Sequence, residues 1–177
     1  MARTDSVLNQ QLALILAAVT PENRLVLQVM LRTGLRVSDV LELPRDKLAR
    51  QFTVRESKTG KPMKCGLPDW LRLEILRRSD GSPWAFPSPT NPQKHRTRQA
   101  VWRDLKRVQR AFRLPINLGT HSMRKTYAVD LMAKYGDLER VRRALNHDNA
   151  TTTVLYAMAD LLAETAPARR VQMKRRR

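Results

Sequence analysis

The sequence predicts a mainly α-helical domain with one small antiparallel β-hairpin, an α+β fold. Apolar residues recur at helical spacing along most of the chain, whereas apolar and polar residues alternate mainly in residues 51–67. The length of 177 residues allows one domain with a substantial core and is too short for two full ones. We therefore expect a single domain over residues 1–165, followed by a basic tail over residues 166–177.

Three helices are predicted before the hairpin. Residues 8–19 carry apolar side chains at helical spacing. Thr20 then offers a capping hydroxyl, and Pro21 suits the first position of a second helix. Gly34 should end that helix, and a short third helix should begin at Val37 and end at Pro44.

The hairpin prediction depends on two alternating segments. Phe52 and Val54 alternate with polar residues on the first strand, and Met63 and Cys65 do so on the second. Residues 57–61 between them read Ser-Lys-Thr-Gly-Lys, which is typical of a turn.

The rest of the chain is predicted to be helical apart from one loop. Four prolines make residues 83–92 a loop. Val101, Leu105, Val108 and Phe112 should share one buried helix face. The helices are expected at residues 69–79, 97–112, 120–135, 137–145 and 151–163, and Gly136 should close the third of these.

The charge of the chain indicates a polyanionic partner. Lys and Arg total 34 against 16 Asp and Glu, which gives a net charge of +18, and the pI is about 11.3. Nucleic acid is the simplest such partner, although a basic surface of the ribosomal-protein kind has the same composition. No apolar run reaches the ~20 residues of a membrane span, and a single cysteine, Cys65, suits a reducing cytoplasm.

Four short stretches carry residues suited to phosphodiester chemistry. Planar guanidinium groups bind two phosphate oxygens at once, so Arg36 and Arg124 are the candidate clamp for charge that grows in the transition state. A lysine at the hairpin tip, Lys58 or the competing Lys61, can protonate the leaving 5′ oxygen. The stretches are Thr33-Gly34-Leu35-Arg36, Ser57-Lys58-Thr59-Gly60-Lys61, His121-Ser122-Met123-Arg124, and Asn146-His147 with Tyr156.

Histidines and one tyrosine complete the candidate site. His121 shares a helix face with Arg124, and His147 can donate to a phosphate oxygen. Tyr156 is the candidate nucleophile, because Tyr127 should pack in the core and Tyr135 lies at a helix end. Its attack leaves a 3′-phosphotyrosine that stores the bond energy, so neither ATP nor a metal is needed. A zinc site built on the three histidines is disfavoured by their spacing.

These four stretches, in this order, resemble the boxes of the tyrosine recombinases, the phage integrase family. Thr33-Gly34-Leu35-Arg36 resembles the first arginine box, and Ser57-Lys58-Thr59-Gly60 resembles the hairpin lysine of lambda-type integrases. His121-x-x-Arg124 resembles the second box, and the spacing from His147 to Tyr156 is that of the family. Asp39 stands where the family often has Glu, and Asn146 where it usually has Gly. Because Asn also tolerates a left-handed backbone, the turn there should survive.

The resemblance implies a catalytic-domain fold and a site-specific recombinase that integrates or excises DNA without a cofactor. It implies that Arg36, Lys58, His121, Arg124 and His147 surround the scissile phosphate while Tyr156 attacks it. The residues expected to bind DNA are Arg36, Lys58, Lys61, Arg124 and Lys125.

The resemblance also implies partners. Double-stranded DNA is the substrate, and the protein is expected to be a monomer when free and a homo-tetramer on DNA, with accessory DNA-bending proteins as further partners. The chain has no room for the N-terminal core-binding domain of the family, so we expect that domain to be absent. A non-catalytic DNA-binding module, a type IB topoisomerase-like enzyme and, more distantly, an RNA-binding protein are the alternatives.

Overall fold

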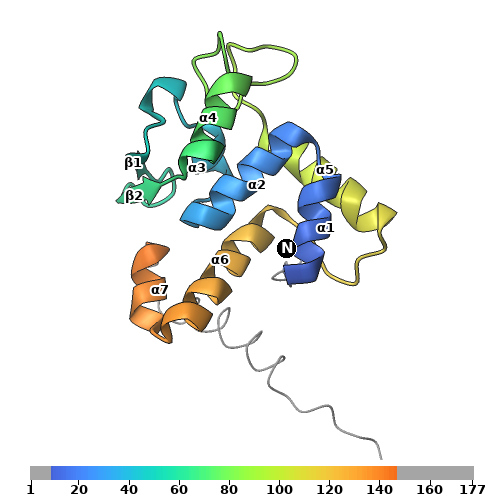
Figure 1. Cartoon of the computed structure of the whole chain (residues 1–177), viewed down its shortest axis with the longest axis vertical. Coiled ribbons are helices and arrows are strands. Elements are labelled where there is room, and N and C mark those ends of the chain that lie inside the picture. The colour runs from blue at the N-terminus through green and yellow to red at the C-terminus, as the bar shows by residue number, and fades with distance from the viewer. Residues whose placement is uncertain (1–8, 147–177) are drawn as a thin grey trace, which may run out of the picture.

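The computed structural model of the chain describes residues 9–146 (Figure 1). The described part is mostly helical with one two-stranded antiparallel sheet, as the sequence predicted. Its elements are α1 (Asn9–Ala18), α2 (Pro21–Thr33), α3 (Val37–Leu41), the 3-10 turn η1 (Arg45–Lys47), β1 (Gln51–Arg55), β2 (Pro62–Gly66), α4 (Asp69–Arg78), α5 (Arg98–Ala111), α6 (Thr120–Tyr135) and α7 (Leu138–Ala144).

Helix α2 lies in the middle of the helical body, with α6 packed along it (Figure 1). Consecutive apolar residues of α2, among them Val26, Leu27 and Val29, are fully buried, because neighbouring helices cover it on several sides. Pro21 opens the helix, and Gly34 ends it in a left-handed conformation with φ of 70°. Both boundaries are as predicted.

The predicted side-chain cap of α2 is wrong. Thr20 makes no side-chain cap bond. Its hydroxyl donates to Asp104 Oδ2 at 3.0 Å, and its backbone N–H donates to the same oxygen at 2.8 Å. In a cap the Thr20 hydroxyl oxygen would accept from a backbone N–H of α2, whereas here the hydroxyl donates to the carboxylate of α5 instead.

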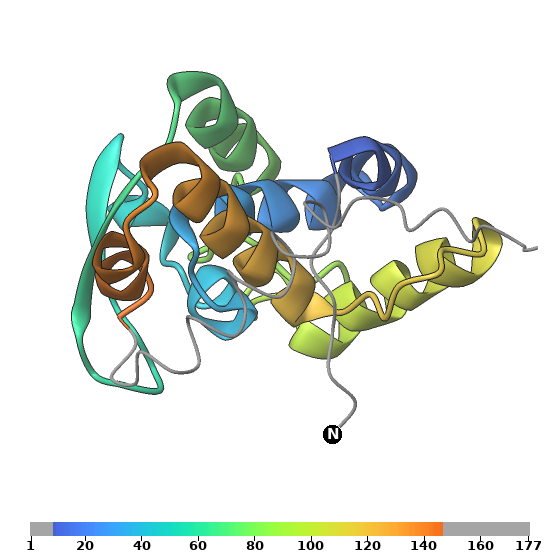
Figure 2. The ribbon, with the colours of Figure 1, turned by 90° about the horizontal axis from the view of Figure 1, so that it is seen from below.

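The predicted hairpin forms, with Phe52 opposite Cys65 and Val54 opposite Met63. Val54, Met63 and Cys65 are buried, so this face of the hairpin packs on the core. Figure 2 shows α7 beside the hairpin, and residues of β2 and the end of α7 line a shared hollow. The hairpin therefore packs on the helical body with α7 beside it.

Helix α5 confirms most of its predicted core face. Val101, Leu105 and Val108 are fully buried, but Phe112 is 47% exposed. The prediction for Phe112 is wrong because the helix ends at Ala111, and the following residue no longer continues its face. The segment before α5 forms only isolated bridges, as expected for a proline-rich loop.

Helix α6 begins at Thr120 and ends at Gly136, whose φ is 62°. Ala128, Val141 and Leu145 form a second small core that joins α6 to α7. None of the helices in residues 9–146 has the length and hydropathy to cross a bilayer. The predicted helix over residues 151–163 and the basic tail lie outside the described residues.

Candidate active site

Arg36 stands at the start of α3, two residues after the glycine that ends α2. Its backbone is extended, with φ of −69° and ψ of 151°. The neighbouring Leu35 and Val37 are buried, which holds the backbone on both sides of Arg36. The side chain is 15% exposed, and its Nη1 donates to Glu56 Oε1 at 2.6 Å. The α2–α3 junction therefore presents this guanidinium to the base of the hairpin.

Arg124 comes from the first turns of α6 and is buried. Its Nη1 donates to Gly34 O and its Nη2 to Leu145 O, both at 2.6 Å. These bonds tie α6 to the end of α2 and to the end of α7. Burial and the nearby charge of Arg36 lower the pKa of Arg124 to about 10, so the group stays charged at neutral pH.

The two guanidinium groups meet at one carboxylate oxygen. Glu56 Oε1 lies 2.6 Å from Arg36 Nη1 and 3.4 Å from Arg124 Nη1. Two segments far apart in the sequence thus place their cations around a single anionic oxygen. The structure brings together the pair that the sequence predicted as a phosphate clamp, while the clamp's action on DNA stays a prediction.

Sequence reasoning missed Glu56, which is fully buried. A signal for it existed. It continues the inward phase of β1, on which Phe52 and Val54 lie, and a charged residue at a buried strand position needs a partner. The sequence alone did not identify that partner, because Arg36 and Arg124 reach Glu56 from other elements.

Asp39 on α3 holds the first residue of the hairpin turn. Its Oδ1 accepts from the backbone N–H of Ser57 at 2.9 Å and from the Ser57 hydroxyl at 2.7 Å. Its other oxygen lies 4.0 Å from Arg36 Nη1. Asp39, which is shorter than the Glu often found at this position in the family, is therefore well placed to bind the turn.

The hairpin turn places Lys58 at its tip. Lys58 and Lys61 are both exposed. The turn is closed by a bond from Gly60 N–H to Glu56 O at 2.8 Å, with Gly60 at φ of 66°. Lys58 lies between Ser57 and Thr59, whose hydroxyls bind Asp39 and Glu56 respectively, whereas Lys61 follows the turn. Both neighbours of Lys58 in the chain are thus bonded to carboxylates beside Arg36, and the choice between Lys58 and Lys61 as the proton donor stays a prediction.

His121 is exposed at the start of α6, one turn before Arg124. Partial burial and the charges of Arg124, Arg98, Arg36 and Lys125 lower its pKa, in that order of importance. A lowered pKa keeps the imidazole neutral at neutral pH, so one ring nitrogen is free to accept a proton. Lys125, the remaining predicted DNA contact, is half-buried beside Arg124.

His147 and Tyr156 lie outside the described residues, so their positions stay predictions. The residue before them, Asn146, has φ of 48°, which is the left-handed conformation expected where the family has Gly. Tyr127 is half-buried and packs against Gly34, and Tyr135 lies under Arg140 at 3.7 Å from the guanidinium carbon. Both alternative tyrosines therefore make packing contacts.

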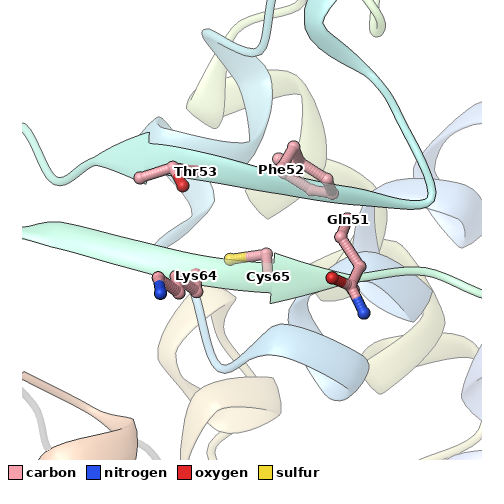
Figure 3. Close-up of a pocket in the computed structure, with 6 residues that line it drawn as sticks. Gln51, Phe52, Thr53, Lys64 and Cys65 are labelled. Carbon is pink, nitrogen blue, oxygen red and sulfur yellow. The ribbon is translucent and has the colours of Figure 1, made fainter.

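Two other features lie apart from this site. Burial and the charge of Glu56 raise the pKa of the Cys65 thiol to about 11, which leaves it unreactive. The hollow in Figure 3 is lined by residues of both strands and contains none of the predicted catalytic side chains. Within residues 9–146, no three His, Cys, Asp or Glu side chains gather where they could bind a metal ion.

Comparisons with known proteins identify the family and the fold. Residues 6–161 match the Phage integrase family. Tyrosine recombinase XerA of Pyrococcus furiosus is 30% identical over 76% of this chain and 49% of its own length. The integrase of Escherichia phage P2 is 26% identical over 87% of this chain and 43% of its own length.

The fold has close structural counterparts. A lambda integrase dimer bound to a COC′ core site superposes with a TM-score of 0.71 at 20% identity, over 89% of this chain and 49% of that one. The chain thus spans about half the length of the curated relatives it matches. It belongs to the phage integrase family, the tyrosine recombinases, and has the fold of their catalytic domain.

Proposed function

We propose that this chain carries out site-specific DNA recombination, integration or excision, by cutting and rejoining DNA through a 3′-phosphotyrosine. One observation carries the proposal. The guanidinium groups of Arg36 and Arg124, from separate elements, both reach the same oxygen of Glu56. A pair of cations that can hold one anionic oxygen fits a phosphate whose charge grows during attack.

Each predicted residue has a role in this reaction. Arg36 and Arg124 bind the non-bridging oxygens, with His121 and His147 beside them. Tyr156 attacks the phosphorus, and the 3′ phosphate becomes bonded to its phenolic oxygen as the bond to the 5′ oxygen breaks. Lys58 protonates that leaving oxygen. Lys61 and Lys125 contact neighbouring phosphates.

Energy balance makes the reaction reversible without ATP. One phosphodiester is exchanged for another, so a 5′ hydroxyl from a second duplex can attack the phosphotyrosine and release Tyr156. The arginines and the lysine supply the positive charge and the proton, so the chemistry requires no metal or cofactor. The chain resembles enzymes that do this in assemblies, and we propose a homo-tetramer on double-stranded DNA and a monomer when free.

The wider setting is also proposed. Residues 1–165 form the catalytic domain, residues 166–177 a basic tail, and the protein works in the cytoplasm with accessory DNA-bending proteins. The net charge of +18 supports DNA as the partner. Affinity should fall steeply with salt, because phosphate contacts release bound counter-ions.

A covalent-capture experiment tests the function. The protein is incubated with a pool of nicked duplexes that carry a randomised central sequence, and adducts resistant to detergent are isolated and sequenced. We expect adducts with the wild type and with Tyr135→Phe, and none with Tyr156→Phe. An adduct from Tyr156→Phe would overturn the choice of nucleophile.

The same experiment separates the alternatives. Tight binding without any adduct would favour a non-catalytic DNA-binding module. Adducts together with relaxation of supercoiled plasmid, but without recombinant products when two captured sites are supplied, would favour a topoisomerase-like enzyme.

A further inference from the structure

Glu56 is a fully buried carboxylate at the base of the turn that carries Lys58. Its backbone N–H donates to Lys61 O at 3.0 Å, and its own carbonyl accepts from Gly60 N–H at 2.8 Å. Both bonds close the loop, so the position of Lys58 depends on the position of Glu56.

The side chain of Glu56 joins this loop to both arginines. Oε1 faces Arg36 Nη1 and Arg124 Nη1, while Oε2 accepts from the Thr59 hydroxyl at 2.9 Å. Thr59 directly follows Lys58. The two oxygens of one carboxylate therefore bind the clamp on one side and the lysine turn on the other.

The residue before Lys58 is held in a matching way. Ser57 donates twice to Asp39 Oδ1, and the other oxygen of Asp39 lies 4.0 Å from Arg36 Nη1. The neighbours of Lys58 on both sides are thus bonded to carboxylates that face Arg36. Lys58 itself is exposed.

Neutralising the arginines would not require this link to Thr59. A buried carboxylate between two guanidinium groups lowers their mutual repulsion whichever group binds its second oxygen. The hydroxyl bond instead ties the turn's geometry to the clamp's geometry. Small misplacement of a catalytic group is costly, because proton transfer requires hydrogen-bond contact with the leaving oxygen.

We propose that Glu56 is a positioning residue that, through Thr59, aligns the proton donor Lys58 with the phosphate clamp of Arg36 and Arg124. This inference depends on the proposed function, because it assigns Glu56 to the same cleavage step. It predicts that breaking the Thr59 link weakens protonation of the leaving group while charge stabilisation by the arginines persists.

A change of leaving atom tests this directly. A duplex with sulfur in place of the bridging 5′ oxygen needs no proton donor, because a thiolate leaves readily near its pKa of about 8.5. Thr59→Val removes the hydroxyl and keeps Glu56 and both arginines. The matched control is Thr53→Val, the same change at an exposed position of β1 in the same hairpin (Figure 3).

Single-turnover cleavage of captured sites is measured with both substrates. We expect Thr59→Val to slow cleavage of the oxygen substrate about tenfold or more, and the sulfur substrate to bring it within about threefold of wild type, as for Lys58→Ala. Thr53→Val should match the wild type on both. Arg124→Lys should stay slow on sulfur, because it loses charge stabilisation rather than the acid.

Two results would overturn the inference. The first is cleavage of the oxygen substrate by Thr59→Val at the wild-type rate. The second is an equal slowing on oxygen and sulfur in a Thr59→Val protein whose urea unfolding matches the wild type. Glu56→Gln, which keeps the shape of the side chain, provides a second variant and should show the same preference for sulfur. Failure of the wild type to cleave either substrate would instead contradict the proposed function.

Discussion

Two buried carboxylates collect hydrogen bonds from distant parts of this chain, and they do so with different partners. Asp104 on α5 accepts from Thr20, Asn23 and Arg107, which ties α5 to the start of α2. Glu56 accepts from Arg36, Arg124 and Thr59 beside the exposed hairpin tip. The donors of Asp104 are mainly neutral, whereas two of the three donors of Glu56 are cations.

The difference separates a structural contact from a candidate site. Burial raises the pKa of Asp104. Hydrogen bonds from Asn23, Thr20 and Arg107 outweigh this effect and hold that pKa below its usual range. All its bonding capacity serves packing of helices. Around Glu56 the positive charges of Arg36, Arg124 and Lys58 exceed the negative charges of the nearby carboxylates, which attracts an anion. The contacts of both carboxylates stabilise the fold, but only those of Glu56 lie where positive charge is in excess.

The largest expected effect is on cleavage. Arg124→Lys loses the forked donors that reach Gly34 O and Leu145 O, so we expect single-turnover cleavage to fall about 100- to 1,000-fold. Arg107→Lys, at the Asp104 contact, should change it by less than about twofold, since that side chain is 55% exposed and remote from the pocket. Equal losses in both variants would remove the distinction between the two carboxylates.

Gly34→Ala should be the most destabilising change near the Glu56 site. An added Cβ would lie 2.5 Å from the Tyr127 ring, at a backbone φ of 70°. We expect urea unfolding to show a loss of about 3 kcal/mol or more, from crowding and strain together. Gly81→Ala is the control. Its φ is 73° but open space surrounds it, so it should cost only about 1 kcal/mol.

Asp104→Ala should lower stability without lowering cleavage by folded protein. Thr20 and Asn23 lose their acceptor, and we expect the free energy of unfolding to fall by about 2 kcal/mol. The contribution of wild-type Asp104 should be present above the carboxyl's unfolded pKa and fade as pH falls through its lower folded pKa. Urea titrations at several acid pH values measure this. A loss of cleavage by folded Asp104→Ala protein would contradict a purely structural role for Asp104.

The smallest effect concerns His121. The lowered folded pKa means that the unfolded chain binds more protons between that pKa and the ordinary value, so stability should rise with pH across this window. Arg98→Gln should raise the His121 pKa, since it removes one of the repelling charges. Proton NMR of the imidazole measures the titration. A pKa at or above the ordinary value in the wild type would contradict the excess of positive charge.

Much of the fold followed from local chemistry. Pro21 and Gly34 mark the ends of α2, Gly136 ends α6, and alternation in residues 51–67 predicted the hairpin. The errors arose where tertiary partners intervened. Thr20 bonds to Asp104 instead of capping its own helix, and Phe112 lies beyond the end of α5.

The candidate site divides in the same way. The spacing of the motifs in the sequence predicts Arg36, Lys58, His121 and Arg124, because phosphate chemistry requires those residue types. Glu56 was overlooked because its role depends on hydrogen bonds to three residues that are separated in the sequence or lie in different elements. His147 and Tyr156 stay predictions from the motif and its spacing.

By itself, the sequence determined the helices, the hairpin and the family to which the chain belongs. These depend on periodicity, turn residues and motif order, which are local or additive properties of the chain. Only the tertiary structure decided that Arg124 binds Gly34 O and Leu145 O and that Glu56 joins both arginines to the Lys58 turn. Such contacts depend on how packed helices bring distant atoms within hydrogen-bond distance, and no local pattern encodes that distance.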